Sequence, residues 1–256
     1  MKRTKIIAHR GANQDAPENT VRAFKLASKQ RADGIEFDIR RTADGHLVVC
    51  HNRTIDDTSN GSGAIRKMTF EELRQYDFGE GEKIPDIREA LQASRGVSEI
   101  TIHVKARAQC DYKDIVQGII DTAKEVGVLN RITIGCFDPV AIIQAKEYDS
   151  TCKTALFSSL WHSPEYIKKL GASAFNPTTK RVNVRMVQLY EKHGIDVNVW
   201  TVNNEQDIAK LISCGVSGII TDIPKRAIEI RREFEKTRAA KESTHKKAAR
   251  YINRSM

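Results

Sequence analysis

Two pairs of charged or ionisable residues stand two positions apart within apolar runs of the sequence. Glu36 and Asp38 form one pair, and His103 and Lys105 form the other. Residues two apart on a strand project to the same side of it. Two carboxylates that converge with a third ligand bind a divalent cation. The first pair therefore predicts a metal site, and the second brings an imidazole and a cation with the same spacing.

Two further histidines and an arginine end apolar runs. His9 and Arg10 follow KIIA, and His51 ends LVVCH. Two imidazoles can act as general base and general acid, whereas Arg10 and Lys105 can bind an anion. A divalent cation, paired imidazoles and fixed positive charges together fit the hydrolysis of a phosphoryl ester.

A purely structural role is the alternative for these residues. Glu36 and Asp38 could form salt bridges to Arg10, Arg40 or Lys105 and bind no metal, because unpaired buried charge is costly. A single histidine at a strand end is more often structural than catalytic. Two histidines beside a carboxylate pair favour catalysis.

Short apolar runs alternate with longer helical patterns along the chain. Eight strands, each followed by a helix, predict that residues 1–224 form one α/β domain, a (β/α)8 TIM barrel. A doubly wound open sheet is the alternative. In a barrel, polar residues at the carboxyl ends of the strands form the active site. The predicted strands are residues 5–9, 34–39, 99–105, 131–137, 154–158, 173–177, 197–202 and 218–222.

One segment, about residues 52–84, breaks the alternation after the second predicted strand. It contains a Gly/Ser/Asn turn (SNGSG), a strand-like AIRKM and TFEELRQYD, which opens as a capped helix. We expect a small insertion on the side of the barrel where such loops shape the active site.

The basic charge of the chain lies mostly at its carboxyl terminus. The net charge is +9, and residues 225–256 hold 11 Lys and Arg against four Asp and Glu, so residues 1–224 carry only +2. Ala227, Ile230 and Phe234 recur at helical spacing, which predicts that this basic helical extension begins against the barrel. Contact of the extension with an anionic membrane or nucleic acid is a weak alternative to a solvated helix, because it lacks a strong apolar face.

Cysteine usage indicates a reducing compartment. The five cysteines, an odd number, contain no CxxC pair, so neither a disulfide framework nor a zinc knuckle is predicted. A cytoplasmic location follows. No apolar run is long enough to span a membrane, and the three apolar residues near the amino terminus are too few for the core of a signal peptide. The cysteines are Cys50, Cys110, Cys136, Cys152 and Cys214.

The residues described so far lie in motifs that resemble the glycerophosphodiester phosphodiesterase family. HRGANQDAPENTVRAF is followed by GIEFDIRRTADGHLVVCHN, SNGSGAI and IPDIREAL, then by HVK, VWTVN and GVSGIITDIP. These motifs span about residues 5–224 in the family's order. The basic extension lies outside the resemblance.

The resemblance implies a hydrolase of lipid and glycerol metabolism that releases glycerol 3-phosphate and an alcohol. It implies that His9 and His51 are the acid/base pair and that Arg10 and Lys105 bind the phosphate. It also implies that Trp200 lines a glycerol pocket, and that Glu36 and Asp38 hold one divalent ion, usually magnesium or calcium. Some relatives act on lysophospholipids.

His103 departs from the family pattern, which usually has Glu as the third metal ligand. An imidazole in place of a carboxylate lowers the ligand charge from about −3 to −2 and suits manganese, zinc or cobalt better than calcium or magnesium. Asn52, Asp57 and Asp86 also replace the family's usual Asp, Arg and Thr. We therefore expect an active phosphodiesterase with an altered metal preference. The alternatives are a catalytically weak protein that binds phosphodiesters or regulates, a lysophospholipase D, or a lyase that yields a cyclic phosphate.

Overall fold

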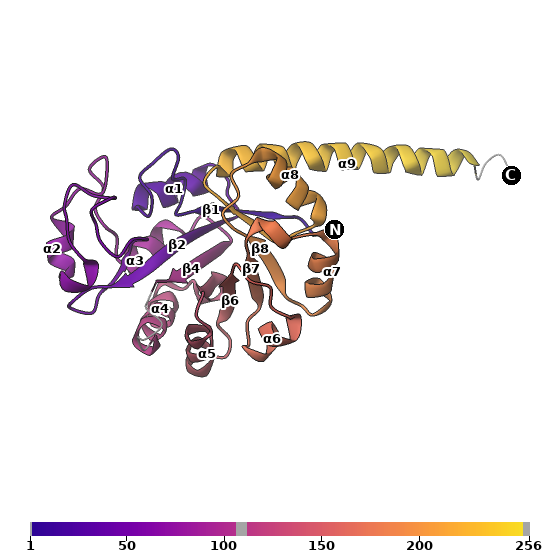
Figure 1. Cartoon of the computed structure of the whole chain (residues 1–256). Coiled ribbons are helices and arrows are strands. Elements are labelled where there is room, and N and C mark those ends of the chain that lie inside the picture. The colour runs from indigo at the N-terminus through magenta and orange to yellow at the C-terminus, as the bar shows by residue number, and fades with distance from the viewer. Residues whose placement is uncertain (1, 106–111, 253–256) are drawn as a thin grey trace.

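Eight parallel strands close into a barrel in the computed structural model, which describes residues 2–105 and 112–252, with side chains up to residue 240. β1 pairs with both β2 and β9, so the sheet has no open edge (Figure 1). This closure confirms the predicted (β/α)8 barrel and excludes the open sheet. The strands are β1 (Lys5–His9), β2 (Gly34–Arg41), β4 (Glu99–Val104), β5 (Ile132–Cys136), β6 (Lys153–Ser158), β7 (Ala174–Pro177), β8 (Asp196–Val199) and β9 (Gly218–Thr221).

Helices connect successive barrel strands and cover the outside of the barrel (Figure 1). Capping residues fix where several of them begin: the side chains of Thr20, Asp138 and Asn204 accept hydrogen bonds from backbone N–H groups in the first turns of α1, α5 and α8. The helices are α1 (Val21–Lys29), α3 (Ile87–Ala93), α4 (Lys113–Val126), α5 (Pro139–Tyr148), α6 (Pro164–Lys169), α7 (Val184–Lys192), α8 (Glu205–Cys214) and α9 (Pro224–Ile252).

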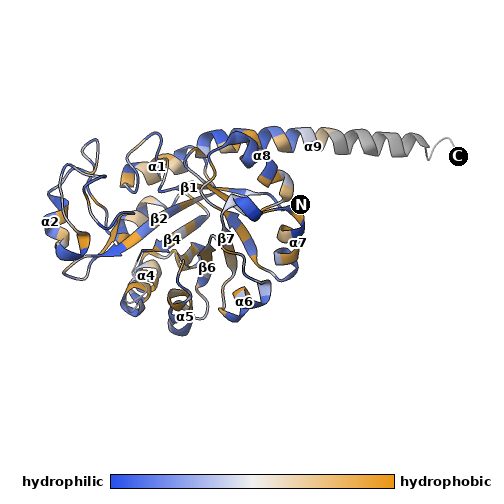
Figure 2. Ribbon diagram, in the orientation of Figure 1, coloured by the Kyte–Doolittle hydropathy of each residue, from blue (hydrophilic) through white to orange (hydrophobic). Residues whose placement is uncertain are grey.

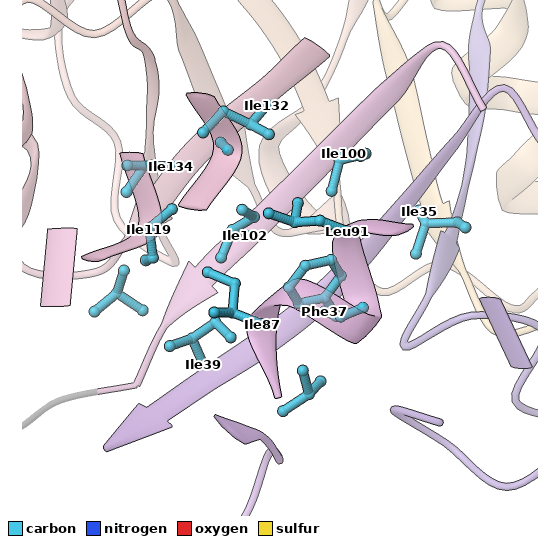
Figure 3. Close-up of a cluster of buried hydrophobic side chains, with 14 of the residues drawn as sticks. Ile35, Phe37, Ile39, Ile87, Leu91, Ile100, Ile102, Ile119, Ile132 and Ile134 are labelled. Atoms are coloured by element: carbon cyan, nitrogen blue, oxygen red, sulfur yellow. The ribbon is translucent and has the colours of Figure 1, made fainter. Parts of the chain in front are cut away.

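The alternation of apolar and acidic residues along β2 separates the core from the barrel interior. Ile35, Phe37 and Ile39 are fully buried and pack against the helices on the outer side of the sheet (Figure 3). Glu36 and Asp38 project to the other side, because successive side chains on a strand point to opposite faces. The two kinds of residue give β2 its alternating orange and blue bands (Figure 2).

The insertion after β2 is a small subdomain with its own apolar cluster. It begins with β3 (Leu47–Val49), antiparallel to β2, and includes α2 (Phe70–Arg74), whose capping box joins Thr69 and Glu72. The expectation of a strand at AIRKM is wrong, because this stretch contains a 3-10 helix, η1 (Ile65–Lys67). Within the described chain its pairing is limited to a single bridge, so the burial of Ile65 decides the local conformation rather than a strand ladder.

The long helix α9 begins against the barrel and then leaves it. Ala227 is fully buried and Ile230 nearly so, whereas Phe234 packs at the edge of the same apolar cluster. Nη1 of Arg231 donates to the carbonyl of Thr4, at the start of β1. The helix therefore runs past the end of the barrel where the strands begin (Figure 1).

Two further observations concern the cysteines and membrane spans. Cys50, Cys136, Cys152 and Cys214 are buried free thiols, and Cys110 lies outside the described residues. Among the described residues, no helix is both long and apolar enough to cross a bilayer.

Candidate active site

The register of three strands brings the first predicted site residues into one layer. His9 on β1 is the Cα partner of Glu36 on β2, and Asp38 is the partner of His103 on β4. Because these strands are parallel neighbours, the four side chains enter the barrel close to its carboxyl end.

Glu36, Asp38 and His103 form a compact cluster of potential metal ligands. One ligand atom from each residue lies within 4.8 Å of the others, and all three side chains are almost fully buried. Nδ1 of His103 lies 3.6 Å from Oε1 of Glu36 and 3.5 Å from Oδ1 of Asp38.

The donor chemistry of this cluster fits a divalent cation. Oε2 of Glu36, Oδ1 of Asp38 and Nε2 of His103 are buried and have no hydrogen-bond partner among the described residues. Lys105 forms an ion pair with Oδ1 of Asp38, but buried carboxylate oxygens that accept no hydrogen bond are costly, and a cation bound between them would lower that cost. Two carboxylates and an imidazole are also a ligand set that divalent metals accept.

An aromatic ring fixes the orientation of His103. Phe157 on β6 stacks on the imidazole with ring centroids 4.4 Å apart and an interplanar angle of 3°. The ring of Phe157 lies over Gly135 on β5. A Cβ atom at Gly135 would come within 2.4 Å of that ring. Gly135 is also the register partner of His103, so the missing side chain on β5 makes room for the stack.

Asp222, directly after β9, holds His9. Nδ1 of His9 lies 2.7 Å from Oδ1 of Asp222, and the amides of Asn13 and Asn203 donate to the same carboxylate at 2.6 and 2.5 Å. Burial acts to raise the pKa of Asp222, but these hydrogen bonds outweigh it and lower the pKa to about 2. The ionised carboxylate keeps the proton on Nδ1, which leaves Nε2 of His9 turned toward Glu36 at 3.9 Å.

His51 is held by an amide rather than by a carboxylate. Its Nδ1 lies 2.8 Å from Oδ1 of Asn52, and Nδ2 of Asn52 donates to Asp57 at 2.9 Å. Asn52 and Asp57, both departures from the family pattern, thus form one chain of hydrogen bonds behind His51. Since the amide oxygen accepts from Nδ1, Nε2 of His51 is the free nitrogen.

Because their partners differ, the pKa values of the two imidazoles shift in opposite directions. Burial acts to lower the pKa of His9, but the hydrogen bond to Asp222 and the charge of Glu36 outweigh it, so the pKa is raised. Burial, together with the positive charge of Lys105, lowers the pKa of His51 despite the nearby Asp38. Environments that move two pKa values apart are typical of an acid/base pair.

Arg10 enters the site from a sharp turn. Its backbone is left-handed, with φ 57°, and Gly11 follows with φ 84°, where a Cβ atom would lie 2.7 Å from Cβ of Ala23. Its Nη1 donates to both carboxylate oxygens of Glu18, at 2.8 and 3.0 Å, and its Nε lies 3.5 Å from Oδ2 of Asp38.

Asp38 is surrounded by positive charge on its other side as well. Nζ of Lys105 lies 3.3 Å from Oδ1 of Asp38. Burial acts to raise the pKa of Asp38, but the charge of Lys105 and the other cationic groups outweighs it and keeps the carboxyl ionised. The salt bridges considered in the sequence thus form for Arg10 and Lys105, and both involve Asp38 of the candidate metal-ligand cluster.

Arg40 contacts the backbone instead of the carboxylates. Its guanidinium donates to the carbonyl of His51, with Nε at 2.9 Å, and its Nη1 donates to the carbonyl of Lys105 at 3.1 Å. One side chain therefore ties together the two segments that carry an imidazole and a cation of the site.

Trp200, directly after β8, forms an aromatic wall beside the cluster. Its Nε1 donates to the carbonyl of Asn176 at 2.6 Å, and Phe137 meets its ring edge-on with centroids 5.3 Å apart. A cavity of about 420 Å³ opens beside His103, Lys105 and Phe137. A larger groove of about 570 Å³ lies between the insertion and the segment that holds Glu18.

All eight predicted site residues lie at the carboxyl end of the barrel, but their supports were missed in the sequence. Asp222 could have been found by applying the strand-end rule to the last strand, which reads GIITD. Arg40 was considered only as a salt-bridge partner. The stacking of Phe157 on His103 had no signal in the sequence, because it depends on the register between β4, β5 and β6.

Known proteins match the chain over most of its length. The model of the glycerophosphoryl diester phosphodiesterase family matches residues 9–226. A glycerophosphodiester phosphodiesterase from Caldanaerobacter subterraneus is 33% identical over 90% of this chain and 99% of its own. One solved structure, a glycerophosphodiester phosphodiesterase from Parabacteroides distasonis, superposes with a TM-score of 0.81 at 25% identity, covering 91% of this chain and 99% of that one.

A second solved structure agrees in fold. It is an Oleispira antarctica phosphodiesterase in complex with the product sn-glycerol-3-phosphate, and it has a TM-score of 0.83 at 24% identity over 88% of this chain and 96% of its own. The family match, which begins at His9 and runs through Asp222, includes every residue of the cluster described above. This protein therefore belongs to the glycerophosphoryl diester phosphodiesterase family.

Proposed function

We propose that this protein hydrolyses glycerophosphodiesters to glycerol 3-phosphate and an alcohol, with one divalent metal ion and with His9 and His51 as acid and base. One observation carries the proposal. Two imidazoles, whose hydrogen-bond partners differ in charge, lie beside the buried candidate metal ligands Glu36 and Asp38. His9 is backed by a carboxylate, and His51 is backed by an amide.

The roles of the two imidazoles follow from their partners. The free Nε2 of His51 accepts a proton from the attacking water as the oxygen–phosphorus bond forms. Nε2 of His9, backed by ionised Asp222, donates a proton to the alcohol oxygen as its bond to phosphorus breaks. The next water and solvent exchange restore both protonation states.

The charged residues around the site bind and orient the phosphodiester. Arg10 and Lys105 carry the positive charge that holds its phosphate oxygens, because charge-assisted hydrogen bonds to phosphate are strong. The glycerol moiety lies against Trp200, in the cavity beside Phe137. The alcohol extends toward the groove formed by the insertion.

Glu36, Asp38 and His103 would hold the metal ion. When bound, a divalent ion neutralises charge on the phosphoryl group and polarises it. Magnesium or calcium is usual in the family, but an imidazole ligand favours manganese, zinc or cobalt. The stacking of Phe157 keeps His103 in a fixed orientation for this role.

A metal and substrate screen tests the proposal. Release of glycerol 3-phosphate from glycerophosphocholine is measured with each of magnesium, calcium, manganese, zinc and cobalt, for the natural protein, His9→Ala and His103→Glu. We expect turnover in the natural protein and a loss of about 10²-fold or more in His9→Ala, since acid/base catalysis contributes that much. Absence of turnover with every metal, in both the natural protein and His103→Glu, would contradict the proposal.

The alternatives differ from the proposed hydrolysis in ligand binding, in product or in preferred substrate. A catalytically weak binding or regulatory protein would bind glycerol 3-phosphate tightly without turnover. A lyase would release a cyclic phosphate, and a lysophospholipase D would prefer a substrate with an acyl chain. Phosphorus NMR identifies a cyclic product, calorimetry measures the binding of glycerol 3-phosphate, and a lysophospholipid assayed beside glycerophosphocholine shows the substrate preference.

We also propose a cytoplasmic location. The four described cysteines are free and buried, as expected in a reducing compartment. Burial raises the pKa of Cys50, Cys136 and Cys152 to about 11, so these thiols remain protonated and unreactive.

A further inference from the structure

Exposed apolar side chains are concentrated in one part of the barrel. Among the residues with described side chains, every large hydrophobic residue that is substantially exposed falls between Phe137 and Leu189. This region comprises α5, α6, α7 and the loops that precede them. Contiguous exposed apolar surface on a protein of this size usually marks an interaction site.

Five of these residues lie at the carboxyl end of the barrel, beside the candidate active site. Because β5, β6 and β7 are parallel neighbours, the loops that follow them lie side by side. We call these five residues the apolar rim. They are Phe137 and Val140 after β5, Leu160 and Trp161 after β6, and Val184 at the start of α7, and they are 44–65% exposed.

Three positive charges stand beside the apolar rim. Lys180, Arg181 and Arg185 are exposed, and none of them forms an ion pair within the described chain. Two acidic residues also lie near the rim: Asp138 accepts from Val140 N–H at 3.0 Å, and Glu165 lies 3.3 Å from His193. The segment from residue 178 to residue 185 contains no acidic residue. This segment therefore gives one side of the rim three positive charges and no negative one.

We propose that the apolar rim and its three cations bind the protein to a negatively charged lipid surface. Trp and Leu side chains insert at the boundary between head groups and acyl chains, and Lys and Arg attract anionic head groups. The loop after β6 exposes Leu160 and Trp161 together, which provides the side chains that insert. The three unpaired cations beside it provide the attraction to anionic head groups.

The position of the rim gives the contact a consequence for access to the site. Phe137 belongs to the rim and also packs against Trp200 and against His103, with ring centroids 5.3 Å away in each case. A lipid surface on the rim therefore lies at the mouth of the candidate active site, where a phosphodiester released from or held in that surface would enter.

The basic extension cannot supply the same contact. α9 leaves the barrel where the strands begin, as the bond between Arg231 and the carbonyl of Thr4 shows (Figure 1). The residues of the rim instead follow the carboxyl ends of β5, β6 and β7. Charge on the rim and charge on the extension can thus be removed separately.

Fluorescence of the two tryptophans tests the proposal directly, since the chain contains only Trp161 and Trp200. In Trp200→Phe, emission reports on Trp161 alone. We expect vesicles of phosphatidylcholine with phosphatidylglycerol to shift it to the blue, and brominated acyl chains to quench it. In Trp161→Phe, the same vesicles should leave the position of the emission maximum unchanged. Absence of the blue shift in Trp200→Phe, or an equal shift in both variants, would overturn the proposal.

Matched variants in the full-length chain test the residues. K180Q/R181Q/R185Q should weaken binding to the mixed vesicles, measured by sedimentation, about 100-fold, because each charge near an anionic surface contributes about 1 kcal/mol, or about fivefold. K241Q/K246Q/K247Q removes the same charge from the extension and should sediment like the natural protein. Leu160→Ser should weaken binding, whereas Leu189→Ser, an exposed leucine away from the rim, should not.

Failure of the lipid-binding proposal can be distinguished from failure of the proposed hydrolysis. K180Q/R181Q/R185Q and Leu160→Ser should hydrolyse soluble glycerophosphocholine at the natural rate, since these four residues, unlike Phe137, have no described contact with the residues of the candidate active site. Equal loss of vesicle binding in the rim and extension variants, or a dimer in solution that buries Trp161 without lipid, would show that the rim is not a lipid-binding surface.

Discussion

Nδ1 of His9 and Oδ1 of Asp222 lie 2.7 Å apart although 213 positions separate them in the chain. Closure of the barrel makes this contact, because β1 and β9 are neighbours. The carboxylate orients the imidazole and, through two amide donors, is itself held in place. His9 therefore presents Nε2 to the site in a fixed tautomer.

Asp222→Asn should lower kcat by about 10²-fold or more with little change in KM. The amide offers one oxygen where the carboxylate offers two, and Asn13 and Asn203 both donate to this position. One donor must then face an NH2 group, which disturbs the orientation of His9. Steady-state kinetics on glycerophosphocholine measure kcat and KM separately. A change confined to KM would contradict a role in positioning the acid.

The rate should depend on pH with a plateau around 6.5. His9 must be protonated to donate, so activity falls as pH rises through its pKa, which is raised above the ordinary 6.5. His51 must be neutral to accept, so activity falls as pH drops below its pKa, which is lowered from the same value. In Asp222→Asn, the alkaline limb of kcat should move to lower pH while the acid limb stays. Movement of the acid limb instead would reverse the two roles.

His103→Glu should shift metal affinity toward magnesium and calcium. The substitution adds a carboxylate to a site that already holds two, and hard cations bind preferentially to oxygen ligands. Affinity for each ion is measured by calorimetry on the metal-free protein, independently of turnover. His103→Gln is the matched control, because it supplies a neutral side chain. An unchanged order of affinities in His103→Glu would show that His103 does not contact the metal.

The sequence was sufficient for the parts of the site that rest on local spacing. The strand period places Glu36 and Asp38 on one side of β2, and the ends of apolar runs reveal His9 and His51. The supports of these residues were harder to predict, because each depends on which strands become neighbours. Arg40, for example, donates to the carbonyls of His51 and Lys105. These two carbonyls come close together only because β3 and β4 both pair with β2.

Gly135→Ala should destabilise the protein by about 1–3 kcal/mol, because the new Cβ would overlap the ring of Phe157. The displaced ring can no longer stack on His103, so metal affinity should fall as well. Phe157→Leu in the same chain removes the ring and should restore part of the lost stability. Denaturant unfolding of the two single variants and the double variant gives the coupling between the two positions. Strictly additive effects would contradict the overlap.

Asp33→Asn should weaken the attachment of α9 and lower the free energy of unfolding by about 1.5–3 kcal/mol. Asp33 accepts hydrogen bonds from Ile6 N–H at 2.8 Å and from the buried guanidinium of Arg231. Burial acts to raise the pKa of Asp33, but these bonds outweigh it and leave the pKa below the ordinary 3.8.

A folded-state pKa below the unfolded value means that the stabilisation is complete above about pH 3.8 and is lost as pH falls through the lowered value. The natural protein should therefore lose stability more steeply than Asp33→Asn as pH falls below 3.8, and the two curves should converge in acid. Urea unfolding at a series of pH values provides the comparison. Glu191→Gln, at an exposed carboxylate on α7, is the control and should leave the dependence of stability on pH unchanged. Parallel curves for the natural protein and Asp33→Asn would show that the ionised form of Asp33 does not hold the helix.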